Sequence, residues 1–362
     1  MRIFIDIGHP AHVHYFKNFI KIMEQHGHEF LITARDKDVA HKLLKSYNFP
    51  FINRGKGKGN LFGKFIYIWK ADLLLYKLAK RYKPDLLLSF ASPYAAHVAK
   101  LIGKPHIVFD DTENAWLNHI LYAPFSNVIL SPNTFLKCFS RKQIFFNSYM
   151  ELCYLHPNYY KPRTEVSKIL GIGADEKYII LRFVSWLANH DIGHSGLTNN
   201  HKIKCVKSLS DYAKVFIVSE SELPMELEKY RINIPAEMMH DALNYCSLLY
   251  GESATMASEC AVLGVPSIYF DNVGRGYTDE EETKYGIVHN FSESLEDQQK
   301  GLEKAIKILE TNDNKKYVQI RDRILSDKID PTAFMVWFVE NYPGSATIMK
   351  ENPEYQNRFK LS

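Results

Sequence analysis

The stretch that most constrains the fold is residues 250–270, where the sequence predicts the end of a strand, a turn, a helix, a tight turn and another strand. At the start of such a helix the first N–H groups have no partners within the helix and lie at the positive end of its dipole. A diphosphate could approach the backbone there, because the turn holds small residues: Gly251, Ser253, Ala254 and Thr255. The pattern predicts half of a nucleotide-binding unit, and an ordinary helix-to-strand connection is the alternative.

Glu259 follows about one turn later in the same predicted helix. Its carboxylate could accept hydrogen bonds from the two hydroxyls of a ribose. Gly264 and Pro266 then end the helix and begin the next strand, as the rules for helix ends predict.

Strand-like apolar runs alternate with helical stretches along the whole chain, which is typical of a parallel sheet covered by helices on both faces. We therefore predict an α/β fold with two doubly wound, Rossmann-like domains facing across a cleft, in which ligands bind at the carboxyl ends of the strands. The predicted strands are 3–7, 29–33, 85–89, 106–109, 127–130, 178–183, 213–218, 248–250 and 267–270, and the predicted helices of the first half are 15–26, 37–47, 66–82 and 95–102.

The length of 362 residues favours two domains, because one hydrophobic core rarely keeps growing to that size. Two prolines and a lack of periodicity at 156–163 predict a boundary there, giving domains 1–158 and 159–330 and a helical tail, 331–362, that packs back on the core. No run of about 18 apolar residues is present. The first residues are typical of a strand rather than a signal peptide, and five scattered cysteines indicate reduced thiols. We expect a cytoplasmic protein.

The charge is unevenly distributed. Residues 1–160 hold 21 Lys and Arg against 11 Asp and Glu, whereas the remainder holds 24 against 30. Much of the excess lies in residues 54–83, where basic residues alternate with aromatic and aliphatic ones. Such a segment suits an anionic membrane surface, and a core helix with a solvated basic face fits equally well. Nucleic acid is a poorer fit, because the apolar residues outnumber what a phosphate-tracking groove needs.

Three histidines, His9, His12 and His14, follow the first predicted strand on a turn that leads into a helix. His12 is a candidate general base, because imidazole titrates near neutral pH. His9 and His14 are candidate acceptor-binding residues, and helix capping is the alternative role for each. We expect no metal site here, because Asp6 lies too far back on its strand to complete a ligand set.

A cluster of carboxylates follows the strand that ends at residue 109: Asp110, Asp111 and Glu113. Crowded carboxylates at the end of a strand need solvent, a cation or a hydroxylic ligand nearby. Asp110 and Glu113 are candidate bases, and Asp111 is a candidate acceptor contact. The alternative is a set of capping groups for the following helix.

Loops in the second half supply further candidates. Arg182 and Ser185 lie at and after the end of the strand 178–183 and could reach a phosphate. Arg275, in a polar loop broken by glycines, is flexible enough to close on a ligand. We expect these side chains to bind the same nucleotide as Gly251, Ser253, Ala254, Thr255 and Glu259.

The segments 8–14, 251–259 and 274–279 together resemble the family called domain of unknown function 354, over most of the chain. That family is remotely similar to the GT-B superfamily, which includes the muramyl-peptide N-acetylglucosaminyltransferase and the UDP-N-acetylglucosamine 2-epimerases. By this resemblance His12 lies near the acceptor or the donor phosphates, residues 253–255 bind the diphosphate and Glu259 holds the ribose. Residues 251–253 are Gly-Glu-Ser where the epimerases have Asp-Ser-Gly-Gly, so the identity of the sugar does not follow.

The resemblance implies a metal-independent glycosyltransferase without a cofactor. Such an enzyme would move a sugar from a nucleotide donor, UDP-linked in the enzymes named above, to a glycan or polyprenyl-linked acceptor in polysaccharide or cell-envelope synthesis. Residues 54–83 would dock it on the inner face of the cytoplasmic membrane. One alternative is a UDP-sugar 2-epimerase, which needs no acceptor. A second is a catalytically silent protein that binds sugar nucleotides.

Overall fold

The computed structural model describes residues 1–37, 39–57, 61–173, 176–184, 196–220 and 222–361. The chain divides into two compact units: a first unit made of Met1–Tyr154 and Lys328–Ser362, and a second unit, Leu155–Asp327. The domains predicted from the sequence end at residues 158 and 330, a few residues from these borders. The C-terminal segment packs on the first unit, where Thr332 Oγ1 donates to the carbonyl of Cys153 (2.9 Å) and the Phe334 ring stacks on Phe146.

The first unit is built on a seven-stranded sheet in the order β3-β2-β1-β4-β5-β6-β7, with neighbouring strands parallel throughout. Continuous apolar runs form its central strands, because both faces of the sheet are covered by helices. The strands are β1 (Arg2–Ile7), β2 (Glu29–Ala34), β3 (Ile52–Asn53), β4 (Leu86–Phe90), β5 (His106–Phe109), β6 (Val128–Pro132) and β7 (Gln143–Phe146).

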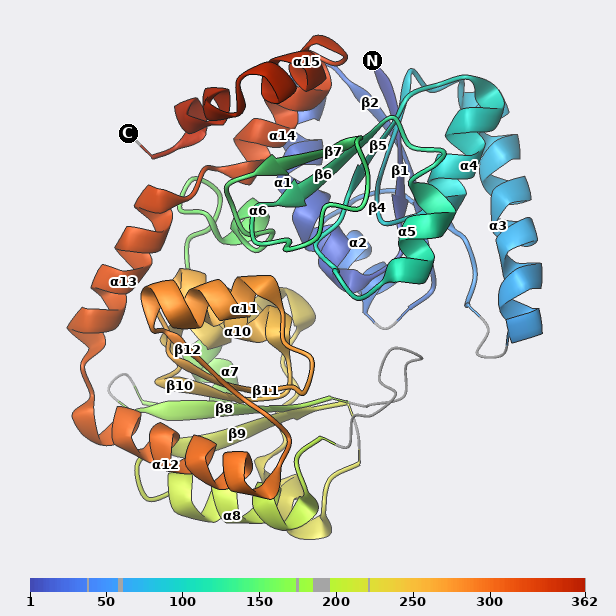
Figure 1. The fold of residues 1–362 in the computed structure, drawn as a ribbon. Coiled ribbons are helices and arrows are strands. Elements are labelled where there is room, and N and C mark those ends of the chain that lie inside the picture. Colours follow the sequence, from blue (N-terminus) through green and yellow to red (C-terminus); the bar gives the residue numbers. More distant parts are fainter. Residues whose placement is uncertain (38, 58–60, 174–175, 185–195, 221, 362) are drawn as a thin grey trace. The chain divides into compact units, whose positions relative to one another are not determined.

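Helices cover both faces of this sheet (Figure 1). One face carries α1 (Pro10–Gln25), α2 (Ala40–Ser46) and α14 (Pro331–Glu340), and the other carries α3 (Leu61–Tyr82), α4 (Pro93–Ile102) and α5 (Trp116–Tyr122). The remaining helical segments of the unit are short: α6 (Leu152–Leu155, which ends at the border of the units), α15 (Gly344–Glu351) and a 3₁₀ helix (Pro353–Phe359).

Helix α1 begins earlier than the sequence predicts. The predicted start was residue 15, but His9 caps the helix by accepting a hydrogen bond from the Ala11 N–H (3.3 Å), and Pro10 occupies the first position. The predicted histidine loop was therefore wrong in part, since His12 and His14 belong to α1. Helix α4 has the same construction, with Ser92 as cap and Pro93 in the first position.

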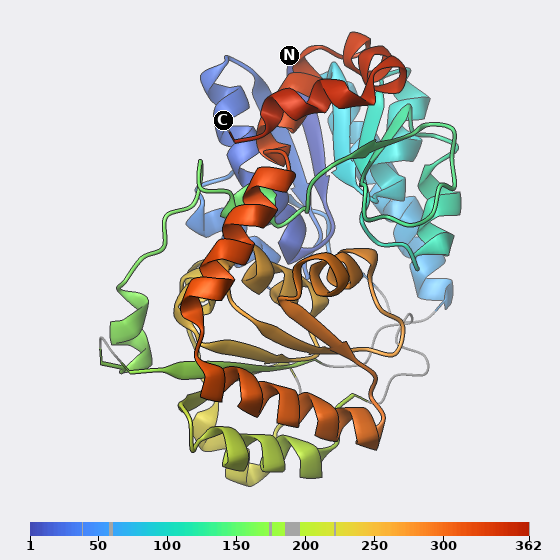
Figure 2. The same cartoon turned by 60° about the vertical axis from the view of Figure 1, so that its left-hand side comes forward.

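The second unit contains a five-stranded parallel sheet in the order β12-β11-β10-β8-β9. Helices α8 and α12 lie on one face, and α10 and α11 lie on the other (Figures 1 and 2). The strands are β8 (Tyr178–Phe183), β9 (Lys214–Ser219), β10 (Leu248–Gly251), β11 (Ser267–Phe270) and β12 (Val288–Phe291). The helices are α7 (Val166–Leu170), α8 (Asn199–Leu209), α9 (Met239–Tyr245), α10 (Ala254–Leu263), α11 (Gly276–Glu280), α12 (Leu295–Thr311) and α13 (Asn314–Asp327), with 3₁₀ turns at Met225–Tyr230 and Ala236–Met238 and a π-helical turn at Glu281–Tyr285.

These strand orders confirm the predicted α/β class and locate one switch point in each sheet. In the first sheet the chain order reverses between β1 and β4, and in the second it reverses between β8 and β10. Ligands of open parallel sheets bind outside the carboxyl ends of the strands at such points. Within the described residues, no helix is both long enough and apolar enough to span a bilayer.

Candidate functional site

In the second unit, the N-terminus of α10 lies at the switch point between β8 and β10. Ser253 caps the helix, its side chain accepting a hydrogen bond from the Met256 N–H (3.3 Å). Ala254 and Thr255 form the first turn and are half-buried. The rest of the helix, residues 256–263, is buried, so its dipole is held in the core while its first turn reaches the surface. This geometry is suited to an anion.

Gly251 has a structural role that the sequence did not reveal. Its φ is +155°, and a Cβ added to it would lie 2.0 Å from the carbonyl oxygen of Arg182. Glycine is therefore required because β10 approaches β8 there, whereas we had predicted that its small size makes room for a diphosphate. The neighbouring Glu252 is buried, and its carboxylate accepts hydrogen bonds from the N–H groups of Val184 (2.9 Å) and Leu197 (2.5 Å). Sequence analysis did not select Glu252.

The two arginines predicted to bind phosphate have protein partners. The Arg182 guanidinium forms an ion pair with Glu220, which follows β9. Arg275 precedes α11 and donates from Nη1 to the carbonyl of Gly274 (3.2 Å). The predicted flexibility of Arg275 is thus limited by its place at the start of a helix. Ser185 lies outside the described residues.

Glu259 is less exposed than the sequence suggested. It is 5% exposed, and its Oε1 lies 3.0 Å from Nε2 of His240 on α9. His240 is also buried. The predicted contact with a ribose stays a prediction, and in this structure the Glu259 carboxylate belongs to a buried pair with His240. No sequence signal points to His240, because it lies nineteen positions before Glu259 in unrelated sequence.

In the first unit, His12 lies at the switch point between β1 and β4. Its ring contacts that of Phe90, the last residue of β4, at a centroid distance of 4.6 Å, and its Nδ1 accepts a hydrogen bond from the Gly8 N–H (3.3 Å). Burial, with further effects of His9, Lys37 and Arg54, holds the pKa of His12 well below its usual value. A neutral imidazole that accepts at Nδ1 carries its proton on Nε2, so His12 is a donor as placed.

The three histidines have separate roles. His9 is the exposed cap of α1. His14 is buried on another face of the helix, with Nδ1 3.3 Å from the hydroxyl of Tyr47 and its ring against Tyr154. The predicted acceptor contact by His14 is therefore wrong, because helical geometry turns it into the packing between α1 and α2.

The carboxylate cluster also divides. Asp110 is fully buried, where it accepts a hydrogen bond from the Tyr122 hydroxyl (2.5 Å) and lies 3.1 Å from Nε2 of His119, so it anchors α5 rather than serving as an accessible base. Glu113 accepts from the Leu136 N–H (3.0 Å). Asp111 is half-buried and accepts a hydrogen bond from the hydroxyl of Tyr15 (3.4 Å).

Tyr15 brings two of the predicted residues into one neighbourhood. Its ring lies parallel to that of His12 at a centroid distance of 6.2 Å, while its hydroxyl reaches Asp111. The first unit therefore offers a neutral histidine donor and a half-buried carboxylate around the ends of β1, β4 and β5. The described residues contain no group of three or more His, Cys, Asp and Glu side chains arranged to hold a metal ion.

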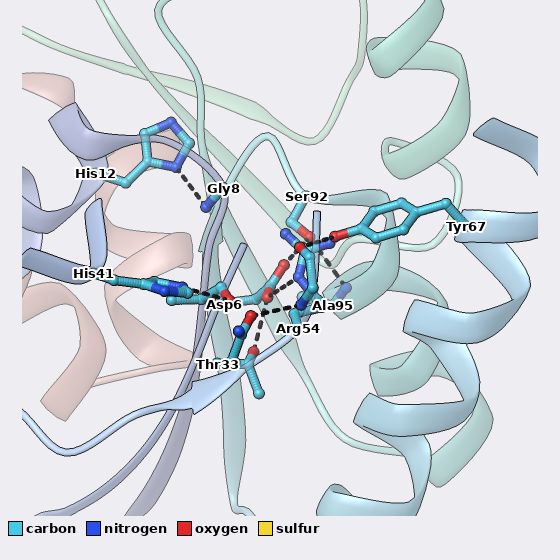
Figure 3. A network of polar contacts seen from close by, with 12 residues as sticks. Asp6, Gly8, His12, Thr33, His41, Arg54, Tyr67, Ser92 and Ala95 are labelled. Atoms are coloured by element: carbon cyan, nitrogen blue, oxygen red, sulfur yellow. Dashed lines mark hydrogen bonds and ion pairs between the residues drawn. The ribbon is translucent and has the colours of Figure 1, made fainter. Parts of the chain in front are cut away.

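A buried polar network that the sequence does not reveal is centred on Asp6 (Figure 3). Asp6 is fully buried and accepts hydrogen bonds from Thr33 Oγ1 (2.8 Å) and Ser92 Oγ (2.5 Å), and its Oδ1 lies 3.0 Å from Arg54 Nε. Arg54 is 6% exposed and extends toward Tyr67 of α3. The network fixes a guanidinium beside Gly8, on the same edge of the sheet as His12.

Two solved structures resemble the whole fold. One is the UDP-N-acetylglucosamine 2-epimerase of Neisseria meningitidis bound to UDP-N-acetylglucosamine, with 12% identity, a TM-score of 0.67 and coverage of 98% of this chain and 100% of that one. The other is MurG of Acinetobacter baumannii, with 14% identity, a TM-score of 0.60 and coverage of 94% and 99%. At these identities the likeness shows the fold alone, which is that of the GT-B proteins.

A curated relative, an uncharacterized protein of Methanocaldococcus jannaschii, is 29% identical over 283 residues, covering 74% of this chain and 80% of its own. The family model described as "Protein of unknown function (DUF354)" matches residues 1–340. The chain therefore belongs to the DUF354 family.

Proposed function

We propose that this protein is a glycosyltransferase that moves a sugar from a UDP-linked donor to a glycan or polyprenyl-linked acceptor in the synthesis of a polysaccharide or cell-envelope glycan. The observation that carries the proposal is the capped, half-exposed N-terminus of α10 at the β8/β10 switch point. Its N–H groups and dipole would stabilise the diphosphate that leaves the sugar, without a metal or cofactor. The fold shared with GT-B enzymes supports the same reaction class, although fold likeness alone is a weaker argument.

The first unit would supply the acceptor chemistry. The acceptor hydroxyl attacks the anomeric carbon, the bond from that carbon to the diphosphate oxygen breaks, and the hydroxyl proton passes to a base. Because His12 already accepts at Nδ1, we assign it the role of hydrogen-bond donor to the acceptor or donor phosphate, and we assign the base to Asp111. Asp111→Asn should lower kcat by about a hundredfold or more, and Glu113→Gln should change it little.

The donor site can be tested by adding a charge to α10. Ala254→Asp puts a carboxylate in the first turn, where it would repel a diphosphate and weaken UDP binding by about tenfold or more in calorimetry. Asn314→Asp is the matched control, because it adds the same charge to the exposed first position of α13, which follows the C-terminal end of α12. Equal affinity of both variants and the wild type for UDP and UDP-sugars would rule out the α10 site.

Helix α3 would dock the protein on an anionic membrane. Its buried face includes Ala71, Leu75 and Ala79, while Trp69 (66% exposed) and Leu73 (55% exposed) lie in contact with solvent. Exposed cations accompany them on this helix: Lys70, Lys77, Lys80 and Arg81. An amphipathic basic helix with exposed aromatic and aliphatic side chains binds the interface of anionic bilayers.

Vesicle sedimentation tests this docking. Replacing Lys77, Lys80 and Arg81 with Glu should release the protein from phosphatidylglycerol vesicles at low salt, because the added negative charges oppose the surface potential. The control replaces Lys307, Lys315 and Lys316 of the second unit with Glu, which changes the net charge equally on other exposed positions. Equal loss of binding in both triple variants would show a nonspecific charge effect and exclude α3 as the docking helix.

The second candidate is a UDP-sugar 2-epimerase. The observation that favours it is the likeness to the Neisseria meningitidis epimerase over 98% of this chain. An epimerase would change the configuration of a sugar nucleotide in the absence of any acceptor, and nuclear magnetic resonance of UDP-N-acetylglucosamine incubated with the protein alone would detect the product. An unchanged sugar that binds favours the transferase, whereas isomerisation establishes the epimerase.

A further inference from the structure

A pocket of about 260 Å³ lies in the first unit between the loop that follows β3 and helix α3. Three of the side chains that line it are cationic, namely Arg54, Lys56 and Lys70. Others are apolar or aromatic, namely Ile66, Tyr67 and Leu74. None of these residues belongs to the donor site at α10, so the pocket is a separate feature of the molecule.

Arg54 is the fixed element of this pocket. Its guanidinium stacks on the ring of Tyr94 at 4.3 Å, and its Nε is paired with Asp6 (Figure 3). Its Nη1 is buried and has no hydrogen-bond partner among the residues that the structure describes. Buried nitrogen donors are nearly always bonded, and this orphaned nitrogen belongs to a side chain that lines the pocket, which suggests a missing acceptor.

The local charge favours an anion as that acceptor. Asp6 offsets the charge of Arg54, and Asp36 lies 3.9 Å from Lys56 Nζ. Lys70 is exposed, and no ion pair with an acid is found for it within the described part of the chain. The walls of the pocket thus keep a positive balance. An oxyanion with several acceptor oxygens could bond the buried guanidinium and both flexible ammonium groups.

The other wall of the pocket is aromatic and apolar, and it favours a ligand with a hydrocarbon part. Tyr67 is held over the pocket by its hydroxyl, which donates to the carbonyl of Gly55 (3.3 Å), and Ile66 and Leu74 are half-buried beside it. The exposed Trp69 and Leu73 lie on the same helix. A ligand with an anionic head and a hydrocarbon tail matches this succession of cations and apolar side chains better than a free phosphate does.

We propose that this pocket binds the diphosphate head of a prenyl-type lipid, with Arg54, Lys56 and Lys70 on the phosphates and Ile66 and Leu74 on the first part of the chain. The inference rests on the proposed function in one respect, since it gives that reaction's lipid-linked acceptor a binding site in the first unit. A free diphosphate shares the head-group chemistry and is distinguished by the test.

The test is calorimetry of the full chain with farnesyl diphosphate and, separately, with inorganic pyrophosphate. We expect farnesyl diphosphate to bind more tightly than pyrophosphate, and Lys56→Glu or Lys70→Glu to weaken it by about tenfold or more. Lys100→Glu is the control, because it reverses an exposed charge on α4 that neither lines the pocket nor belongs to the proposed docking helix. Arg54→Gln should weaken binding further, and the two exposed lysine variants keep the test valid if the loss of Arg54 disturbs folding.

The outcomes separate the two proposals. Equal affinity for pyrophosphate and farnesyl diphosphate would overturn the lipid assignment, and equal binding by the Lys70→Glu and Lys100→Glu variants would overturn the pocket itself. Titrating UDP into the same samples reports on the second unit. The pocket is supported if Lys70→Glu no longer binds farnesyl diphosphate but binds UDP as the wild type does. If the wild type binds farnesyl diphosphate through the pocket but does not bind UDP at all, the pocket stands and the proposed transferase fails.

Discussion

At Gly251 the backbone of β10 comes into close contact with β8, and a single side-chain atom would be too large. With φ at +155° and only 2.0 Å between an added Cβ and the Arg182 carbonyl oxygen, alanine requires both a strained dihedral and a displacement of the strand. The following residue, Glu252, depends on the same geometry, because its N–H donates to that carbonyl (3.0 Å) and its carboxylate bonds Val184 and Leu197. One glycine thus sets the course of the chain between β10 and the N-terminus of α10.

We therefore expect Gly251→Ala to lower the free energy of unfolding by about 3 kcal/mol or more in urea denaturation. Gly27→Ala is the matched control, because Gly27 also has a positive φ, +82°, but a Cβ there meets no atom within 4 Å. The control should lose about 1 kcal/mol, the cost of the dihedral alone. Similar losses in the two variants would show that the close approach of β10 to β8 has no energetic weight.

At the residue scale, the sequence predicts which side chains follow a strand, but it does not predict the residues with which they form hydrogen bonds or ion pairs. The prediction of Ser253 as part of a helix N-terminus is confirmed, because capping is a local property. The pairs Asp6 with Arg54 and Glu259 with His240 join different elements and depend on the tertiary fold. His12 and His14 are only two residues apart in α1, but successive residues of a helix point in different directions, so their side chains lie on different faces.

At the scale of elements, the central strands were predictable, whereas three of the four edge strands were not. Runs such as residues 3–5 and 178–181 are apolar throughout, because helices cover both faces of their sheets. Three strands escaped prediction, and all three lie at sheet edges: β3, β7 and β12. β3 has only two residues, and three of the four residues of β12 are half-buried, so these edge strands lack the apolar run that marks a central strand.

Strand β5 carries a titratable group whose effect on stability has a definite sign. His106 is fully buried between Ser89 Oγ and Ser126 Oγ, each 2.9 Å from a ring nitrogen, and burial, with a smaller effect of His97, lowers its pKa from 6.5 to about 3. Protons therefore bind the unfolded chain more readily than the folded one. This contribution to stability is fully present above pH 6.5 and is lost as the pH falls from 6.5 toward 3.

As the pH falls from 7 to 5, protonation of His106 in the unfolded chain should lower the free energy of unfolding by about 2 kcal/mol. The folded chain keeps this histidine neutral over that interval. Urea unfolding at a series of pH values should show a shallower pH dependence for His106→Gln than for the wild type. Ser126→Ala is the control, because it removes the two hydrogen bonds of this hydroxyl and keeps the imidazole, so it should lower stability at all pH values alike. An unchanged slope in His106→Gln would show that this histidine is not the titrating group.

At the scale of the whole molecule, the chain leaves the first unit at residue 154 and returns to it at residue 328. The returning segment completes the first unit through long-range contacts. Asn147 N–H donates to Gln356 Oε1 (2.6 Å), Ser148 Oγ donates to the Ile329 carbonyl (2.8 Å), and Phe334 is fully buried. The sequence indicated that this aromatic segment returns to a core, and the contacts show that the core in question is that of the first unit.

This connectivity predicts different consequences for two cuts. The fragment 155–327 contains a complete five-stranded sheet with helices on both faces, so we expect it to unfold cooperatively and to bind UDP as the full chain does. The fragment 1–154 lacks α14, which packs on α1, so circular dichroism and gel filtration should show that it is unfolded or aggregated.

Joining residue 154 to residue 328 by a short Gly-Ser linker supplies the control, because it restores the missing helices and should restore a cooperative transition. A folded 1–154 fragment would show that the C-terminal segment is dispensable, and loss of UDP binding by a folded 155–327 fragment would place part of the donor site outside the second unit.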